Sequence, residues 1–560
     1  MTWSHRQPES VSAPVRLAAT KPYRLSFSRS LIRTMSTERW RIETETIVLD
    51  ADGNGRASYR IITPGHVLTF VVFSQEVPER HRTGRIAEPC FDGMGFLYDG
   101  IPGDDRIELE RSELLKRSGG RTDWHTIGWT LATRSSASVD HVVDSLARGT
   151  QPDRDLLLEQ GGYLIRNNGF YGNGRHGSRT WASIPASHPL SEPYRPEMLT
   201  LYLWRHFGFD LVQSMAAQRS KTATVLSNSI MRLVGLGNSS GQGMSTLLIK
   251  QPDWLQSWLE TRESAFSHCV NTTADSEAIA RVAQLLDRAE LSILDRDRTD
   301  NPFSCSTAQL RADLGSIRTM VPNLVIPGDS WERLAVWARE NTHLEALETF
   351  LSILTETYSA WVDEQSPMLR SRMTRQAIWV GDLTVRQLEK LISDRYRWSL
   401  ELAAMPDCSK FFFYYSEDEG EPRVGYRQTD PGVEYETFAS VPQAVRALND
   451  DLCKASPDQT VARFLVSNPE HRYIVERVLG HADDAYAEIR SNATSPQWVA
   501  SNLSRFVLGT FGMENAHVPN HRYVLGVFFQ GAPTSKDIAG STHTDWIYPG
   551  NAPVAKDPSL

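Results

Sequence analysis

Two glycine-rich segments hold the residues of this sequence that are best suited to bind an anion. The first is Gly235–Met244, which reads Gly-Leu-Gly-Asn-Ser-Ser-Gly-Gln-Gly-Met. Glycine has no Cβ, so successive backbone N–H groups of such a segment can surround a phosphate or a carboxylate. We therefore expect ligand contacts from Gly237, Asn238, Ser239, Gly241 and Gly243.

Ser240 lies in the middle of this segment and is a candidate catalytic nucleophile, although no neighbour in the sequence could act as its base. The Lys-Ser/Thr pair that ends a P-loop is missing, because Met244-Ser245 stands in its place. The segment also follows the helical pattern of 226–233 rather than a strand, which argues against a dinucleotide site. The alternative is a tight turn between two helices.

The second glycine-rich segment is Arg166–Arg179, which carries three arginines, three asparagines and one histidine in fourteen residues. Arginine guanidinium groups bind carboxylates and phosphates through two hydrogen bonds at once. The candidate ligand-binding residues here are Arg166, Asn173 and Arg175. His176 is the candidate general acid–base, because imidazole titrates near neutral pH. The alternative is a polar surface loop.

Both segments flank the two apolar helices that we expect between residues 196 and 233. A pocket between helices is a common place for a ligand, and we expect the two segments to share one. Sequence gives no reason to expect a metal or another cofactor. His517 and His521 have the spacing of two ligands on a helix, but Pro519 between them disfavours a regular helix.

The composition is that of a globular protein and excludes several other classes. The chain has 560 residues, 40% of them hydrophobic and 23% charged, and a net charge of -9. This balance disfavours general nucleic-acid binding, although the basic N-terminal segment and Arg166–Arg179 keep a local site open. There is no run of about 18 apolar residues that would predict a membrane span. Five scattered cysteines indicate a reducing compartment, and we expect a cytoplasmic protein.

Hydrophobic periodicity predicts an α+β fold that is predominantly helical. We expect a small N-terminal antiparallel meander of three strands between Trp40 and Val77, a large helical body and a mixed C-terminal region. The predicted units are a basic N-terminal segment (1–36), a β-rich domain (37–136), a helical domain (137–404), an α+β region (405–535) and a tail (536–560). Helices are expected over 139–148, 153–167, 196–204, 253–266, 275–293, 306–318, 330–363, 385–404, 441–453, 460–490 and 496–510. Strands are expected over 409–427, as a hairpin, and over 523–529.

Residues 1–36 are basic and rich in serine, which is typical of a disordered head or of a transit peptide. However, the chain also contains, in this order, the stretches Ser28–Arg33, Glu38–Arg41, Tyr171–Gly174, Gly235–Met244, Glu421–Arg423 and Phe528–Pro533. Taken together, these stretches resemble a family of large bacterial proteins of no known activity. The resemblance spans about 25 to 535 and implies that residues 25–36 belong to the folded protein. It implies no activity, cofactor or catalytic residue.

These observations predict a soluble enzyme that acts on a small anionic metabolite, a carboxylate or a phosphate, by non-redox chemistry. Lyase, isomerase or hydrolase chemistry is preferred, because no nucleotide-cofactor motif is present. A homo-oligomer is compatible with the sequence. The alternative function is that of a non-catalytic helical scaffold or partner-binding protein.

Overall fold

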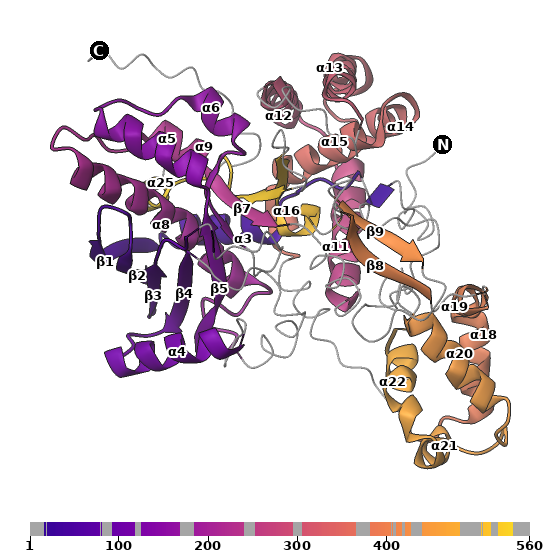
Figure 1. Cartoon of the computed structure of the whole chain (residues 1–560). Coiled ribbons are helices and arrows are strands. Elements are labelled where there is room, and N and C mark those ends of the chain that lie inside the picture. The colour runs from indigo at the N-terminus through magenta and orange to yellow at the C-terminus, as the bar shows by residue number, and fades with distance from the viewer. Residues whose placement is uncertain are drawn as a thin grey trace.

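The structure is a computed structural model of the chain (Figure 1). It describes residues 16–17, 19–78, 80, 92–117, 125–167, 184–239, 252–294, 305–365, 381–404, 406, 410–416, 421–426, 440–481, 506, 508–516 and 525–540.

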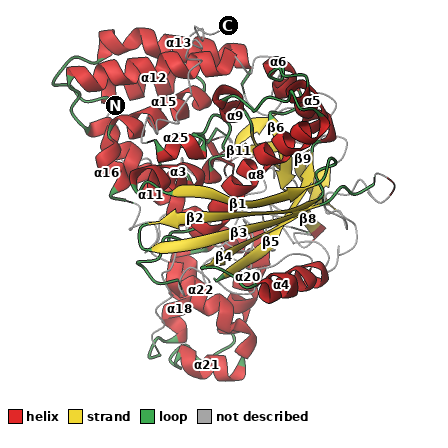
Figure 2. Cartoon of the chain, turned by 90° about the vertical axis from the view of Figure 1, so that its left-hand side faces the viewer, coloured by secondary structure: helices red, strands yellow, loops and turns green. Residues whose placement is uncertain are grey.

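A nine-stranded sheet lies at the centre of the main body (Figure 2). Its strands are β1 (Arg41–Leu49), β2 (Gly55–Thr63), β3 (His66–Ser74), β4 (Gly93–Asp99), β5 (Thr126–Arg134), β6 (Tyr163–Asn167), β7 (Gly235–Ser239), β11 (Leu525–Phe528) and β10 (Glu514–Ala516), in that spatial order. Neighbours are antiparallel except for β6 and β7, which are parallel. The predicted three-stranded meander is β1–β3 and is confirmed.

Helices cover both faces of the sheet. α8 (Arg195–Arg219) lies on one face, and its Trp204 packs edge-on against Phe70 of β3. Gly93 and Gly95 of β4 make room for this indole, because a Cβ at either position would lie 2.7 and 2.9 Å from the Trp204 ring. On the other face, α4 (Asp104–Arg117) adds Ile107 to a small apolar cluster with residues of β3 and β4.

The remaining helices of the main body share one hydrophobic core with the sheet, which extends from Leu17 to Ile538. They are α3 (Phe27–Thr37), α5 (Ser136–Ala147), α6 (Arg154–Glu159), α9 (Asn228–Leu233), α11 (Pro252–Asn271), α12 (Ser276–Leu294), α13 (Thr307–Leu324), α14 (Glu332–Asn341), α15 (Leu344–Thr357), α16 (Ser359–Asp363) and α25 (Ser535–Ala539). The fold is therefore α+β and predominantly helical, as predicted.

The basic N-terminal segment is folded where the structure describes it, so the expected disordered head is wrong for residues 19–36. α3 buries Leu31, Ile32 and Met35 in the main core. The basic side chains before it pair with acidic residues of α15 and α16: Lys21 Nζ lies 3.1 Å from Glu345 Oε2, and Arg24 Nη1 lies 2.6 Å from Glu356 Oε2. The positive charge of this segment is thus used inside the fold.

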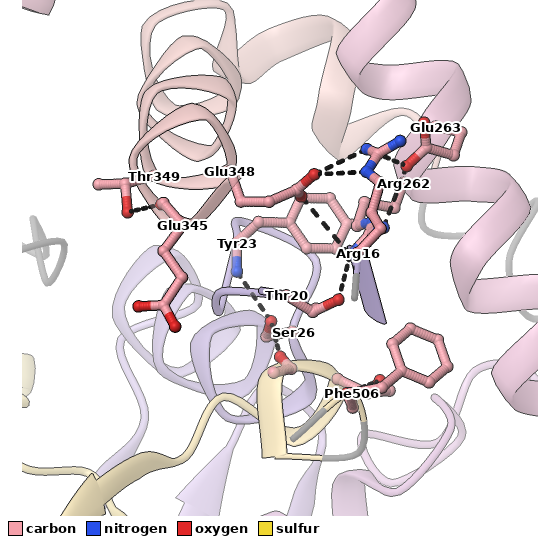
Figure 3. A network of polar contacts seen from close by, with 12 residues as sticks. Arg16, Thr20, Tyr23, Ser26, Arg262, Glu263, Glu345, Glu348, Thr349 and Phe506 are labelled. Atoms are coloured by element: carbon pink, nitrogen blue, oxygen red, sulfur yellow. Dashed lines mark hydrogen bonds and ion pairs between the residues drawn. The ribbon is translucent and has the colours of Figure 1, made fainter. Parts of the chain in front are cut away.

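Figure 3 shows the most buried of these contacts, a cluster of two arginines and two glutamates. Arg16 donates to Glu348 Oε1 at 2.7 Å and to Glu263 Oε1 at 3.2 Å. Arg262 donates to the same Glu263 oxygen at 3.1 Å and to Thr20 Oγ1 at 2.8 Å. Buried charges are tolerated only when they are paired in this way. The cluster therefore holds the N-terminal segment between α11 and α15.

A second group of helices has its own core, built from residues between Val385 and Val478. Its elements are α18 (Val385–Arg395), α19 (Arg397–Ala403), α20 (Ser440–Leu452), α21 (Val461–Ser467), the short 3-10 helix η4 (Pro469–His471) and α22 (Arg472–His481). They form the lobe at the lower right of Figure 1. The predicted hairpin is confirmed as β8 (Phe411–Ser416) and β9 (Glu421–Tyr426), which pair antiparallel.

Several elements differ from the sequence prediction. The helix expected over 153–167 ends at Glu159, and the chain then turns at Gly161 and Gly162, both with positive φ, into β6. The helix expected over 330–363 is three helices. The sheet also joins strands from both sides of the predicted boundaries at 137 and 405. Among the described residues, no helix is long and apolar enough to span a bilayer.

Candidate functional site

The two glycine-rich segments start side by side in the sheet. Arg166 pairs with Gly237 and Asn167 with Asn238, where β6 and β7 run parallel and end at the same edge. The alternative interpretation of the first glycine segment, a tight turn between two helices, is therefore wrong for residues 235–239, which form β7. In sheets with parallel strands, ligands commonly bind beyond the carboxyl ends of those strands. The described residues of the two segments end there, at Asn167 and at Ser239.

A β-bulge brings Tyr163 and Arg166 to the same face of the sheet. Tyr163 pairs with Gly235, and Arg166 pairs with Gly237, so β6 has one more residue than β7 between these two pairs. Paired residues share a face, and residues two apart on a strand share a face as well. Tyr163, Arg166 and the two glycines therefore all point to one side.

Arg166 carries a half-buried positive charge at this edge. Its guanidinium makes no hydrogen bond or ion pair with any residue that the structure describes, although its charge interacts electrostatically with Tyr163. Burial raises the pKa of the Tyr163 hydroxyl, and the Arg166 charge acts in the opposite direction. An arginine placed in this way is suited to a carboxylate or a phosphate.

Gly235 and Gly237 are required by packing within the sheet. A Cβ at Gly237 would lie 2.8 Å from the Tyr163 ring, and a Cβ at Gly235 would lie 2.5 Å from the carbonyl oxygen of Phe528. The Tyr163 ring thus occupies the space next to the backbone of β7 at Gly237. For Gly237 the structure supplies a packing role, and the proposed ligand contact remains a prediction.

Asn167 and Asn238 are fully buried next to each other, one on each parallel strand. Ser239 is the last residue of β7 and pairs with Leu525 of β11. Ligand contacts of Asn238 and Ser239 remain predictions. The other predicted site residues lie outside the described residues: Asn173, Arg175, His176, Ser240, Gly241 and Gly243.

Arg205 of α8 fixes the start of β7. Its Nε donates to the carbonyl oxygen of Val234 at 2.7 Å, and its Nη2 donates to those of Met231 at 2.8 Å and Ala532 at 3.0 Å. Burial lowers the pKa of Arg205 to about 10. Carbonyl dipoles at the end of α9 are thus arranged around a buried cation, and they hold β7 in register beside β6.

A histidine cluster that the sequence analysis did not find lies at the ends of β3, β4 and β5. Asp99 at the end of β4 is 3.3 Å from Nε2 of His188 and 3.1 Å from Nδ1 of His125, through different carboxylate oxygens. The His66 ring packs edge-on against His188 with 4.7 Å between ring centroids. Burial lowers the pKa of His188, and the bond with Asp99 opposes this. These residues are far apart in the sequence, so no local motif connects them.

The histidine cluster lies further along the sheet in the direction in which β6 and β7 run. β5 is antiparallel to β6, so its first residue, Thr126, lies in the direction in which β6 ends. Ala132 of β5 pairs with Asn167, and Tyr98 pairs with Thr126. From Thr126 to Ala132 a strand rises about 20 Å, at about 3.3 Å per residue. The cluster and Arg166 are therefore distinct sites.

β10 and β11 bring a third segment to this edge. Ala516, the last residue of β10, pairs with Leu525, the first residue of β11, and Leu525 in turn pairs with Ser239. The connection between these strands contains His517 and His521, which lie outside the described residues.

A cavity of about 400 Å³ lies at the end of the sheet that is away from the histidine cluster, lined among others by Arg56, Phe73 and Arg111. Both arginines already have carboxylate partners: Arg56 lies 3.3 Å from Asp104, and Arg111 lies 3.6 Å from Glu108. Arg111 also stacks on the Phe73 ring at 4.5 Å. This cavity is therefore a weaker anion site than the edge at Arg166.

Comparisons with known proteins give no match: no protein-family model, no curated protein and no solved structure is similar to the chain.

Proposed function

We propose that this protein is an enzyme that binds a small anionic metabolite, a carboxylate or a phosphate, beyond the carboxyl ends of β6 and β7. The proposal rests mainly on the in-register pairing of Arg166 with Gly237 and of Asn167 with Asn238. This pairing brings the starts of two anion-suited segments, far apart in sequence, into direct contact.

Arg166 is the basic side chain that supports an anionic ligand. It is half-buried and makes no ion pair within the described part of the chain. A cation that is partly removed from water gains by pairing with an anion. In this proposal Arg166 and Arg175 bind the carboxylate or phosphate, and backbone N–H groups of the segment around Gly241 complete its coordination.

The chemistry assigned to the site is non-redox proton transfer, with His176 as the general acid–base. Many lyase, isomerase and hydrolase reactions use such a group to transfer a proton in the transition state. Ser240 is the candidate nucleophile, and its base would have to come from the other segment. Each of these roles is part of the proposal.

A thermal-shift screen tests whether the protein binds an anionic metabolite at this site. The purified full-length protein is heated with inorganic phosphate, with citrate and with a panel of phosphorylated and carboxylated metabolites. We expect at least one compound to raise the Tm of the wild-type protein. Arg166→Ala, Arg175→Ala and Gly241→Val should each abolish that shift, because each removes a charge or fills the space at the anion site.

Arg333→Ala is the matched control. Arg333 of α14 is exposed, and its Nη1 lies 4.0 Å from Oδ2 of Asp329. Its substitution should leave the ligand-induced shift intact. A shift that persists in all three site variants, or a wild-type protein that no compound stabilises, contradicts the proposal. A stable stoichiometric protein partner in the latter case would favour the scaffold alternative.

A further inference from the structure

Three side chains from separate parts of the chain converge at the end of the sheet opposite Arg134. His66 begins β3, Asp99 ends β4, and His188 lies in the segment before α8. One ligating atom from each, a ring nitrogen or a carboxylate oxygen, lies within 4.8 Å of the other two. Two imidazoles and one carboxylate are a ligand set of zinc and related divalent transition metals.

The spacing suits a single ion. Metal–nitrogen and metal–oxygen bonds of about 2.0–2.2 Å in a tetrahedral site place neighbouring ligand atoms about 3.4 Å apart. Nε2 of His188 and Oδ1 of Asp99 are 3.3 Å apart. His66 faces this pair, and its ring makes no hydrogen bond to either of them or to any other described residue.

We propose that His66, Asp99 and His188 bind one divalent transition-metal ion of the zinc type. Three protein ligands leave a fourth position for water, which is the arrangement of catalytic rather than structural zinc sites. The proposal does not depend on the anion site at Arg166, because about 20 Å of β5 separates the two.

His125 and Leu190 define how the ligands are held. Nδ1 of His125 lies 3.1 Å from Oδ2 of Asp99, so a metal would bind through Oδ1, and His125 orients the carboxylate from outside. Leu190 N–H donates to Nδ1 of His188 at 3.2 Å, so Nε2 carries the ring proton that points to Asp99. Metal binding at Nε2 requires this single ring proton to move to Nδ1, and the ring then gives up the hydrogen bond from Leu190. Such sites bind metal more weakly at low pH.

A second histidine–carboxylate cluster provides the control. Asp451, Glu470 and His471 also bring ligand atoms within 4.8 Å. There, however, Asp451 accepts from Lys454 Nζ at 2.7 Å and from His471 at 2.9 Å. The lysine already neutralises this carboxylate, and the cluster offers a single imidazole. We therefore expect no tight metal binding at Asp451.

The test is a competition titration of the full-length protein with Zn²⁺ after removal of bound metal by a chelator. We expect one equivalent of tight binding in the wild-type protein. His66→Ala, His188→Gln and Asp99→Asn should each weaken that equivalent by about 100-fold or more, since each removes a ligand. His471→Gln should leave it unchanged. Co²⁺ in place of Zn²⁺ should give the visible absorption bands of a low-coordinate site, which the three variants lose.

Asp99→Asn guards against misfolding as an explanation, because the amide keeps the shape of the side chain and an acceptor for the histidine at Oδ1. Near-UV circular dichroism of each variant verifies the fold. Wild-type protein without a tight Zn²⁺ equivalent overturns the proposal. So does an equivalent that survives in the folded variants, or one that is lost equally in His471→Gln. None of these readouts requires a substrate, so failure here leaves the proposed function untouched.

Discussion

Arg134 and Arg166 occupy neighbouring strands, yet their surroundings differ. At the end of β5, the guanidinium of Arg134 donates to the carbonyl oxygen of Asp52 at 2.5 Å and to Ser74 Oγ at 3.4 Å. These bonds tie the turn between β1 and β2 to the sheet. Arg166 lies close by on β6, where it pairs with Thr133, and its guanidinium has no such partner among the described residues. One arginine is used by the fold, and the other is the one that we propose binds a ligand.

The comparison shows that residue type does not separate structural from functional arginines. Arg205 and Arg262 are almost fully buried, and each donates to several fixed acceptors. Their charge is stabilised before any ligand arrives. Among the residues that the structure describes, Arg166 has no such acceptor, and this difference supports the proposal that it belongs to the anion site.

The largest expected effect is that of Arg205→Met. The substitution keeps the apolar stem but leaves the carbonyl groups of Met231, Val234 and Ala532 without their donor. Buried acceptors that lose a charged partner cost about 3 kcal/mol or more of unfolding free energy. Chemical denaturation measures this loss, with Arg333→Ala as the control. A change below about 1 kcal/mol would show that the carbonyl groups find other donors.

Arg134→Ala tests the comparison itself. Loss of its bonds to the β1–β2 turn should lower the unfolding free energy by about 1–2 kcal/mol, while ligand-induced stabilisation persists. Arg166→Ala should behave in the opposite way, with unfolding free energy within about 0.5 kcal/mol of the wild type and with ligand stabilisation lost. Denaturation and thermal shift on the same two proteins measure both quantities. If the two variants changed the unfolding free energy and the ligand-induced stabilisation equally, Arg134 and Arg166 would not differ in role.

The smallest expected effect concerns pH. His206 of α8 is half-buried, and this partial burial lowers its pKa below the usual 6.5. The unfolded chain then binds a proton at a higher pH than the folded protein does. Stability should therefore be fully present above about pH 6.5 and decrease as the pH falls below it. Comparing the unfolding free energies of the wild type and His206→Gln at pH 7.5 and 5.5 isolates the contribution of His206 to this pH dependence. If His206→Gln had the same pH dependence of stability as the wild type, His206 would not be its source.

The sequence predicted local structure well where a pattern was long. The alternation between Trp40 and Val77 and the apolar run that begins at Pro196 correspond to β1–β3 and α8. β6 and β7 were missed because each has five residues. The glycines of β7 also have low strand propensity and are compensated by Tyr163 and β11.

The residues of the candidate sites were predictable only where a local pattern in the sequence marked them. Composition identified both glycine-rich segments, but their contact depends on a parallel pairing across 71 residues between Arg166 and Gly237, which no local signal encodes. The histidine cluster was invisible because His66, Asp99 and His188 share no motif. Long-range strand pairing creates both arrangements.

Hydrogen exchange measured by mass spectrometry tests the central claim most directly. The full-length protein is compared with and without the compound that gives the largest thermal shift. We predict protection of peptides from both glycine-rich segments, 166–179 and 235–244, in the same experiment, because one anion would contact both. Protection of one segment only, or of peptides elsewhere in the chain, would contradict a shared site at the ends of β6 and β7.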